Sequence, residues 1–451
     1  MRITVPRPAA GLVVVASAVG LLATATAARA AGYGIYEQGS KALGMAGAFT
    51  AVADDPSALF YNPAGIGTLD GTQVNGGLHL IRIEREFAGE SAYPGYGVTE
   101  EGTVDVGTPV NLYVTHRLAD AVGIGVGVNN PFGLKVGWED PEAFTGRFVS
   151  REASLTPFTL TGVLAWNISR AFSVGGGPTF TTASIGLMRN VGAINPFYGD
   201  SRFPGAAQLL DLGTADIDGD GTSWGWTAGA LLRFEKGFRA GLSYHSPVDI
   251  DYDGTADFAF QFDGSGNAVL DALLGPALRA GFPEDQDVSV TLPLPASAAF
   301  GLAFDPATDW TVAADAVWTG WSRVGSVGLT FADPGLDTRI VEDWDDVVAL
   351  RAGVEWRASA SWAWRGGAYF DPSPQPTASV DPLLPDADRV GLTLGVGIGD
   401  GPLHLDAYGL AIITEDRSTR GESRRGYDGT YASGALVGGL NLTWSFGGGR
   451  Q

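Results

Sequence analysis

Two short motifs carry residue types and spacings that can support chemistry. Gly221-Thr-Ser223-Trp-Gly225 matches the G-x-S-x-G pattern that presents a serine nucleophile in hydrolases. That chemistry needs a sharp strand-to-helix turn and a histidine beside the serine, whereas the residues after Ser223 alternate as in a strand. The four histidines show no suggestive spacing; they are His79, His116, His245 and His404. We therefore predict no catalytic residue and no enzymatic activity.

The second motif, Asp216-Ile-Asp218-Gly-Asp220-Gly221, matches the first half of an EF-hand calcium loop. Such a loop closes with a bidentate glutamate at its twelfth position, where this chain has Thr227. The sequence predicts an acidic loop here, with no tight metal site and no cofactor. A weak Ca²⁺ site, or divalent bridging to lipopolysaccharide, is the alternative.

Charge and cysteine content exclude further classes of function. The chain has 451 residues, a formal net charge of −22 and no cysteine. A negative surface repels phosphates, so nucleic acid is not expected as a partner. Disulfides and thiolate metal sites are excluded as well. Solvated loops of an exported protein account for the acidic clusters, which are Glu139-Asp140, Asp216 to Asp220, Asp249 to Asp257, Glu284 to Asp287 and Glu342 to Asp346.

The start of the chain has the composition of a secretory signal peptide. Arg2 and Arg7 precede an uncharged apolar stretch, and Ala28-Arg29-Ala30 offers small residues where a signal peptidase cuts. We predict a signal peptide over residues 1–30. A transmembrane anchor is the alternative, but the apolar stretch breaks into Ala and Thr before Ala30.

Alternation with period two predicts the elements that must position any site. In Val122-Gly-Ile124-Gly-Val126-Gly-Val128 the branched residues fall on one strand face and only glycines on the other. Leu392 to Ile398 and Leu436 to Phe446 alternate in the same way. The apolar face suits lipid, and the face of Gly, Thr, Asn and Ser suits a lumen. Similar stretches cover 72–86, 106–117, 155–168, 171–188, 223–234, 238–246, 297–305, 309–318, 347–357, 361–370 and 403–413.

The connections between these stretches are of two kinds. Short polar ones include Asn167 to Arg170, Asp305 to Asp309 and Ser359 to Ser361. The long ones are 131–154, 189–222, 247–296, 319–346, 371–390 and 414–431. Short turns on one side and long loops on the other are typical of outer-membrane barrels, so we predict an all-β, transmembrane antiparallel β-barrel of about 14 strands. A soluble β-sandwich also alternates, but its strands are shorter.

Several short motifs also stand in a specific order along the predicted mature chain. Near its start these are Gly32, Glu37-Gln38, Leu43-Gly44, Ala53-Asp54-Asp55, Phe60-Tyr61 and Asn62-Pro63-Ala64-Gly65. Further along they are Asn130-Pro131-Phe132-Gly133, Gly146-Arg147-Phe148, Leu294 to Ser297, Trp318 to Ser322, Asp371 to Pro374 and Leu384 to Arg389. In this order and spacing they resemble the FadL/TodX family of outer-membrane channels for hydrophobic molecules.

The resemblance implies an N-terminal hatch that plugs the barrel. Residues 31–71 would form this hatch with short helices, around a turn made by Asn62, Pro63, Ala64 and Gly65. The barrel would then span 72–446, and residues 447–451 would form a C-terminal tail after Phe446. On the residues alone, Asn62-Pro63 predicts only an Asx-Pro turn, because proline fixes φ and pushes the residue before it to an extended conformation.

Asn129, Asn130, Pro131, Phe132 and Gly133 directly follow a strongly alternating stretch. Proline cannot donate to a strand ladder and glycine permits unusual dihedrals, so strand pairing should break here. The residues alone are compatible with a strand that simply ends in a loop. The resemblance implies a kink in the third strand that opens the wall sideways and releases the ligand into the membrane.

The function that the resemblance implies is passive uptake of hydrophobic molecules, with long-chain fatty acids first. Apolar contact area would supply the affinity, and an arginine could hold a carboxylate. The candidate arginines are Arg189, Arg147 and Arg339, with solvated loop arginines as the alternative. An aromatic-hydrocarbon channel of the same family, a general porin and a surface adhesin remain alternatives. We expect a monomer in the outer membrane of a Gram-negative bacterium, surrounded by outer-membrane lipid and lipopolysaccharide.

Overall fold

The computed structural model describes residues 32–447, so the predicted signal peptide lies outside the described residues. The strands form a closed antiparallel barrel of 14 strands, which confirms the predicted fold class. The ring closes because β1 (Thr72–Gly89) pairs with both β4 (Val110–Ala119) and β22 (Gly429–Phe446). A closed ring leaves no strand edge unpaired, which is what lipid requires of a spanning sheet.

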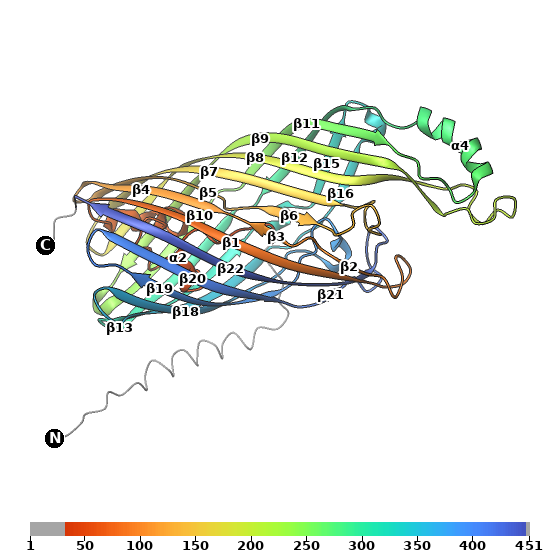
Figure 1. The fold of residues 1–451 in the computed structure, drawn as a ribbon. Helices are drawn as coiled ribbons and strands as arrows, with labels where there is room; N and C mark the ends of the chain where they lie inside the picture. The colour runs from red at the N-terminus through yellow and green to blue at the C-terminus, as the bar shows by residue number, and fades with distance from the viewer. Residues whose placement is uncertain (1–31, 448–451) are drawn as a thin grey trace, which may run out of the picture.

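From β4 the ring passes through neighbours that follow one another along the chain. They are β5 (Val122–Asn129), β7 (Glu152–Asn167), β8 (Phe172–Ile194), β9 (Leu209–Arg233), β10 (Phe238–His245), β13 (Ser297–Ala307), β14 (Trp310–Thr319), β17 (Val347–Arg357), β18 (Trp362–Asp371), β19 (Arg389–Ile398) and β20 (Leu403–Thr414). Figure 1 shows short turns at the end of the barrel where β22 finishes and longer excursions at the other end.

Residue alternation explains the two faces of the wall. Along β19, Leu392 and Leu394 are exposed on the outside, whereas Thr393 between them is buried inside. Aromatic rings gather at the short-turn end, where Trp310 stacks on Trp356 with ring centroids 5.8 Å apart. An apolar outer band bordered by aromatic rings is the surface of a membrane barrel. Among the described residues, no helix is both long and apolar enough to cross a membrane.

The strands at the long-loop end reach further than the sequence predicted. β8 runs to Ile194 and β9 begins at Leu209, so Asp216 to Asp220 lie in a strand, and the prediction of an acidic loop there is wrong. Ile217 is buried against the inner residues Ile250 and Tyr252 of the next strand, while Asp218 points outward. One buried face is sufficient to stabilise a strand, and the acidic residues occupy the solvated face.

The remaining helices and strands lie mainly in the half of the molecule that carries the long connections. They are β2 (Thr99–Glu101), β3 (Asp105–Gly107), β6 (Leu134–Gly137), β11 (Val248–Phe260), β12 (Gln286–Leu294), β15 (Ser326–Phe331), β16 (Thr338–Val341), β21 (Arg417–Ser418), α4 (Ala268–Ala280), η2 (Glu235–Gly237), η3 (Trp321–Arg323), η4 (Pro334–Leu336) and η5 (Thr377–Ser379). The predicted loop 247–296 is thus mostly β11, α4 and β12, and α4 lies beyond the barrel rim (Figure 1).

The segment before β1, residues 32–71, is called the N-terminal segment below. It contains α2 (Ser40–Gly44), α3 (Ala58–Tyr61) and the 3-10 helix η1 (Pro63–Thr68). These elements contact the inner faces of the wall strands, and α2 lies within the barrel near its short-turn end (Figure 1). α2 and η1 fit the lumen because they consist largely of small residues, several of them fully buried.

Candidate functional site

The Asn-Pro-Ala turn is held against the inner wall by the side chain of Asn62. Its Nδ2 donates to the carbonyl oxygens of Thr50, at 2.8 Å, and of Ala230 in β9, at 3.0 Å. A Cβ atom added to Gly229 would lie 2.1 Å from Asn62 Oδ1, so only glycine permits this close approach. The glycine face predicted for the lumen therefore serves as the contact surface for the turn.

Inward-pointing polar residues elsewhere in the wall bind the backbone of the N-terminal segment. Asp315 Oδ2 in β14 accepts hydrogen bonds from the amides of Phe49, at 2.9 Å, and Thr50, at 2.8 Å. Asn441 Oδ1 in β22 accepts from the amide of Ser40 at 2.9 Å. β14 and β22 are separated in the ring by β17, β18, β19 and β20, so the segment is fixed on more than one side.

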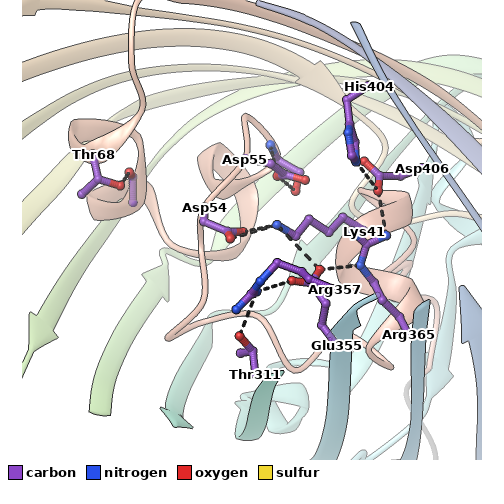
Figure 2. A network of polar contacts seen from close by, with 12 residues as sticks. Lys41, Asp54, Asp55, Thr68, Thr311, Glu355, Arg357, Arg365, His404 and Asp406 are labelled. Carbon is purple, nitrogen blue, oxygen red and sulfur yellow. Dashed lines mark hydrogen bonds and ion pairs between the residues drawn. The ribbon is translucent and has the colours of Figure 1, made fainter. Parts of the chain in front are cut away.

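A buried ion network joins α2 to the wall near the short-turn end (Figure 2). Lys41 Nζ lies 2.8 Å from Asp54 and 3.9 Å from Glu355 Oε2. Glu355 also binds Arg365 at 2.7 Å, and Arg365 reaches Asp406 at 2.7 Å. Because these wall side chains are almost fully buried, loss of one partner would leave an uncompensated charge.

The predicted kink residues interrupt the ladder between the third barrel strand and β7. β5 pairs with β7 as far as Asn129 opposite Thr159, and pairing resumes in β6 with Leu134 opposite Leu155. Residues 130–133 therefore oppose only residues 156–158, one residue more on the β5 side. One extra residue on one strand is the geometry of a bulge.

The N-terminal segment takes up the backbone groups that this interruption frees. The amide of Ile35 donates to Pro131 O at 3.0 Å, and the amide of Gly133 donates to Tyr33 O at 2.9 Å. Gln38 Nε2 donates to the carbonyl of Asn130. A short strand-like pairing thus lies directly behind the break in the wall.

A cavity lies between the N-terminal segment and the wall at this level. Its space is about 1300 Å³ when the part open to solvent is counted. Its apolar lining includes Ile35, Phe60, Phe132, Val317 and Trp321. Apolar walls with a few fixed polar groups are typical of sites for small ligands.

The charged lining of the cavity is a pair of arginines beside carboxylates. The Arg351 guanidinium lies over the rings of Tyr36 and Tyr369, 3.9 and 4.8 Å from their centroids. Arg351 Nη2 and Arg389 Nε lie 3.6 and 3.7 Å from the same Asp371 oxygen. Within the described residues, the Nε–H of each arginine has no hydrogen-bond partner. Both Nε atoms are themselves buried. Two cationic groups beside apolar walls suit a carboxylate.

The three arginines singled out from the sequence lie outside this lining. Arg147 binds Asp211 at 2.9 Å, and the exposed Arg339 donates to Ser326 Oγ at 2.8 Å. Arg189 lies inside β8, partly buried, and its Nε has no partner among the described residues. Arg389 is the last residue of the motif Leu384 to Arg389. Its place in that motif was the one feature of the sequence that could have indicated an arginine of the cavity lining.

The motifs that resemble catalytic and metal sites have no suitable surroundings. Ser223 lies in the middle of β9, and no strand-to-helix turn presents its hydroxyl. In the described part of the chain, no group of three or more His, Asp or Glu side chains is arranged to hold a metal ion.

Comparison with known sequences places this geometry among transport proteins. The sequence model of the family described as outer membrane protein transport protein (OMPP1/FadL/TodX) matches residues 21–446. The long-chain fatty acid transport protein of Escherichia coli O6:H1 is 25% identical over 453 residues, covering 96% of this chain and 98% of that protein. Outer membrane protein P1 of Haemophilus influenzae is 26% identical over 475 residues, covering 95% and 98%.

Solved structures share the same fold. A Pseudomonas aeruginosa FadL homologue superposes with a TM-score of 0.78 at 20% identity, covering 92% of this chain and all of that one. The Pseudomonas putida toluene transporter TodX superposes with a TM-score of 0.68 at 14% identity, covering 93% of this chain. At these identities the likeness concerns the barrel architecture and not the ligand.

Proposed function

The chain belongs to the outer membrane protein transport family of OMPP1, FadL and TodX, and we propose that it admits long-chain fatty acids across the outer membrane. The family consists of outer-membrane transporters of hydrophobic compounds, and the closed barrel agrees with that location. No energy source is needed, because a ligand can diffuse down its gradient through a series of binding sites.

One observation carries the choice of fatty acid over other hydrophobic molecules. Arg351 and Arg389 place two guanidinium groups in the lining of a cavity that also carries aromatic, aliphatic and hydroxyl-bearing side chains and the carboxylates of Glu37 and Asp371. A fatty acid places one carboxylate and one alkyl chain in such a site, where charge-assisted hydrogen bonds hold the head and buried area, at roughly 25 cal/mol per Å², holds the tail. Relatives along nearly the whole chain are named as long-chain fatty acid transport proteins.

Uptake of aromatic hydrocarbons is the second candidate, because toluene transporters share the fold. A neutral aromatic molecule gains from the apolar lining but has no group for the arginines. Substitution of Arg351 and Arg389 should therefore distinguish a fatty acid from an aromatic hydrocarbon as the ligand.

The test compares stearate binding and toluene uptake in the Arg351→Met/Arg389→Met variant. We expect affinity for stearate to fall at least about tenfold, since a charge-assisted bond contributes about 1.5–3 kcal/mol, with toluene uptake unchanged. Arg339→Met, outside the cavity, is the matched control. Unchanged stearate affinity in the double variant would contradict the proposal.

We also propose the route that the ligand takes. Residues 31–71 act as a hatch, and the ladder break at 129–133 acts as a lateral exit from the cavity. Support comes from the position of the cavity, whose lining includes both Asn129 and Pro131. Lateral release would keep a hydrophobic molecule out of the aqueous periplasm.

A further inference from the structure

Part of the cavity wall carries hydroxyl groups that bind no other group in the described part of the chain. Thr161 in β7 lies opposite Thr179 in β8, and Ser297 in β13 lies opposite Thr319 in β14. All four line the cavity. None of these hydroxyls has a hydrogen-bond partner among residues 32–447, and none is sealed in dry protein, so they face the open space of the cavity.

Other hydroxyl groups of the same lining differ because they form hydrogen bonds within the protein. Thr159 and Thr181, one step along the same two strands, share a hydrogen bond of 2.9 Å. Ser246 Oγ accepts the amide of Trp226 at 2.9 Å. The four free hydroxyls are therefore not required to hold the wall together, and they are available to a ligand.

Their distance from the arginines indicates which part of a ligand they would meet. Thr319 pairs with Val347, and Arg351 stands four residues further along β17 on the same inner face. Four residues of strand span about 13 Å. A carboxylate held at Arg351 would thus be separated from the hydroxyl group of Thr319 by a substantial length of alkyl chain.

A plain alkyl chain is poorly matched to this wall. Water that enters the cavity can hydrogen-bond to these hydroxyls, and an alkyl chain that displaces such water does not replace its hydrogen bonds, which lowers affinity. A site that can hydrogen-bond a ligand hydroxyl disfavours the analogue that lacks it. Aromatic and aliphatic residues alone would form the better lining for an unsubstituted chain.

We infer that the preferred ligand is a long-chain fatty acid that carries an oxygen function, such as a hydroxyl group, along its chain. The arginine pair binds its carboxylate, and one of the two hydroxyl pairs, Thr161 with Thr179 or Ser297 with Thr319, binds the chain oxygen. This inference rests on the proposed function and narrows it to a chemical class of fatty acid.

The experiment measures calorimetric affinities of the purified, detergent-solubilised protein for stearate, 10-hydroxystearate and 12-hydroxystearate. We expect at least one hydroxy acid to bind about tenfold more tightly than stearate, as one added hydrogen bond allows. Thr161→Val/Thr179→Val and Ser297→Ala/Thr319→Val remove the hydroxyls pair by pair. At least one of them should bring that ratio close to one by weakening only the hydroxy acid.

Thr182→Val, on the exposed outer face of β8, is the matched control and should keep the full preference. Thr179→Ser retains the hydroxyl and should keep it too. If stearate binds as tightly as both hydroxy acids, or if the ratio survives loss of all four hydroxyls, this inference is wrong while the proposed function stands. If none of the three acids binds, the proposed function fails and this inference fails with it.

Discussion

At the scale of single residues, the lumen is organised by wall side chains that bind backbone groups of the N-terminal segment. Asp315 and Asn441 bind amides of the segment, and Asn62 of the segment binds the carbonyls of Thr50 and of Ala230 in the wall. Each satisfies groups that would otherwise be buried without partners. A buried group that loses its partner costs about 1–3 kcal/mol. Substitutions at these positions should therefore loosen the segment locally and leave the barrel folded.

Asp315→Ala tests this at two amides. It removes the acceptor of Phe49 and Thr50, so hydrogen exchange at these amides should accelerate at least about tenfold. Asp315→Asn keeps an oxygen acceptor, so its exchange rates at these two amides should lie between those of wild type and those of Asp315→Ala. Asp305→Ala, near the end of β13 where the carboxylate binds Arg239, is the control and should leave exchange at residues 49–50 unchanged.

Glu342, in the connection between β16 and β17, should make stability depend on pH. Burial raises the pKa of Glu342, and the charge of Asp381 raises it further, while Arg425 and a 2.9 Å hydrogen bond from Trp344 Nε1 oppose the shift. Because the folded pKa is raised, its contribution is fully present below the usual glutamate pKa and is lost as pH rises through the raised value.

We therefore expect wild type to lose heat stability relative to Glu342→Gln as pH rises from 5 to 9. The measurement is the temperature at which heating converts the folded barrel into the unfolded chain, seen as a change of mobility on a denaturing gel. A constant difference between the two proteins across that range would show that Glu342 does not titrate there.

At the scale of elements, the decisive feature is the interruption between β5 and β6. A proline in the wall removes a ladder hydrogen bond, and lipid offers no replacement partner. Here the N-terminal segment supplies the partners instead, through Ile35 and Tyr33. The break is therefore stable only while that segment is in place, which couples the proposed hatch to the proposed exit.

Replacing Asn130 to Gly133 with alternating Val and Thr should restore continuous pairing. We expect a barrel of at least wild-type heat stability whose uptake of radiolabelled stearate falls about tenfold or more, because the exit is closed. Pro178→Thr changes an exposed proline in β8 and is the control. Normal uptake by the straightened variant would place the exit elsewhere.

At the scale of the whole molecule, the barrel and the N-terminal segment have separable roles. The ladders that close the ring join β1 to β4 and β22 and include no residue of the segment, whereas the segment contacts the wall on several sides. Deleting residues 32–71 should leave a folded barrel with single-channel conductance raised at least severalfold, because ions can cross the cleared lumen. Deleting 268–280, which lies beyond the rim, should leave conductance unchanged, and equal conductance in both deletions would argue against the hatch.

The sequence alone determined the alternating strands of the barrel and the position of the ladder break. Period-two alternation of Val and Gly in residues 122–128 fixes a strand with one lipid face, because side chains of a strand point to opposite sides. Pro131 fixes a ladder break because it has no amide hydrogen. These are local constraints, and they need no knowledge of distant residues.

Only the tertiary structure decided which charged and polar residues meet in the cavity. Arg351 and Arg389 lie on β17 and β19, and they come together only when both strands pair with β18 in the right register, so their spacing in the chain gave no sign of a pair. The sequence predicted a loop at Asp216 to Asp220 because acidic residues usually lie in solvent-exposed segments. Burial of the opposite face against β11 made them part of a strand, and that contact is set by strands from a distant part of the chain.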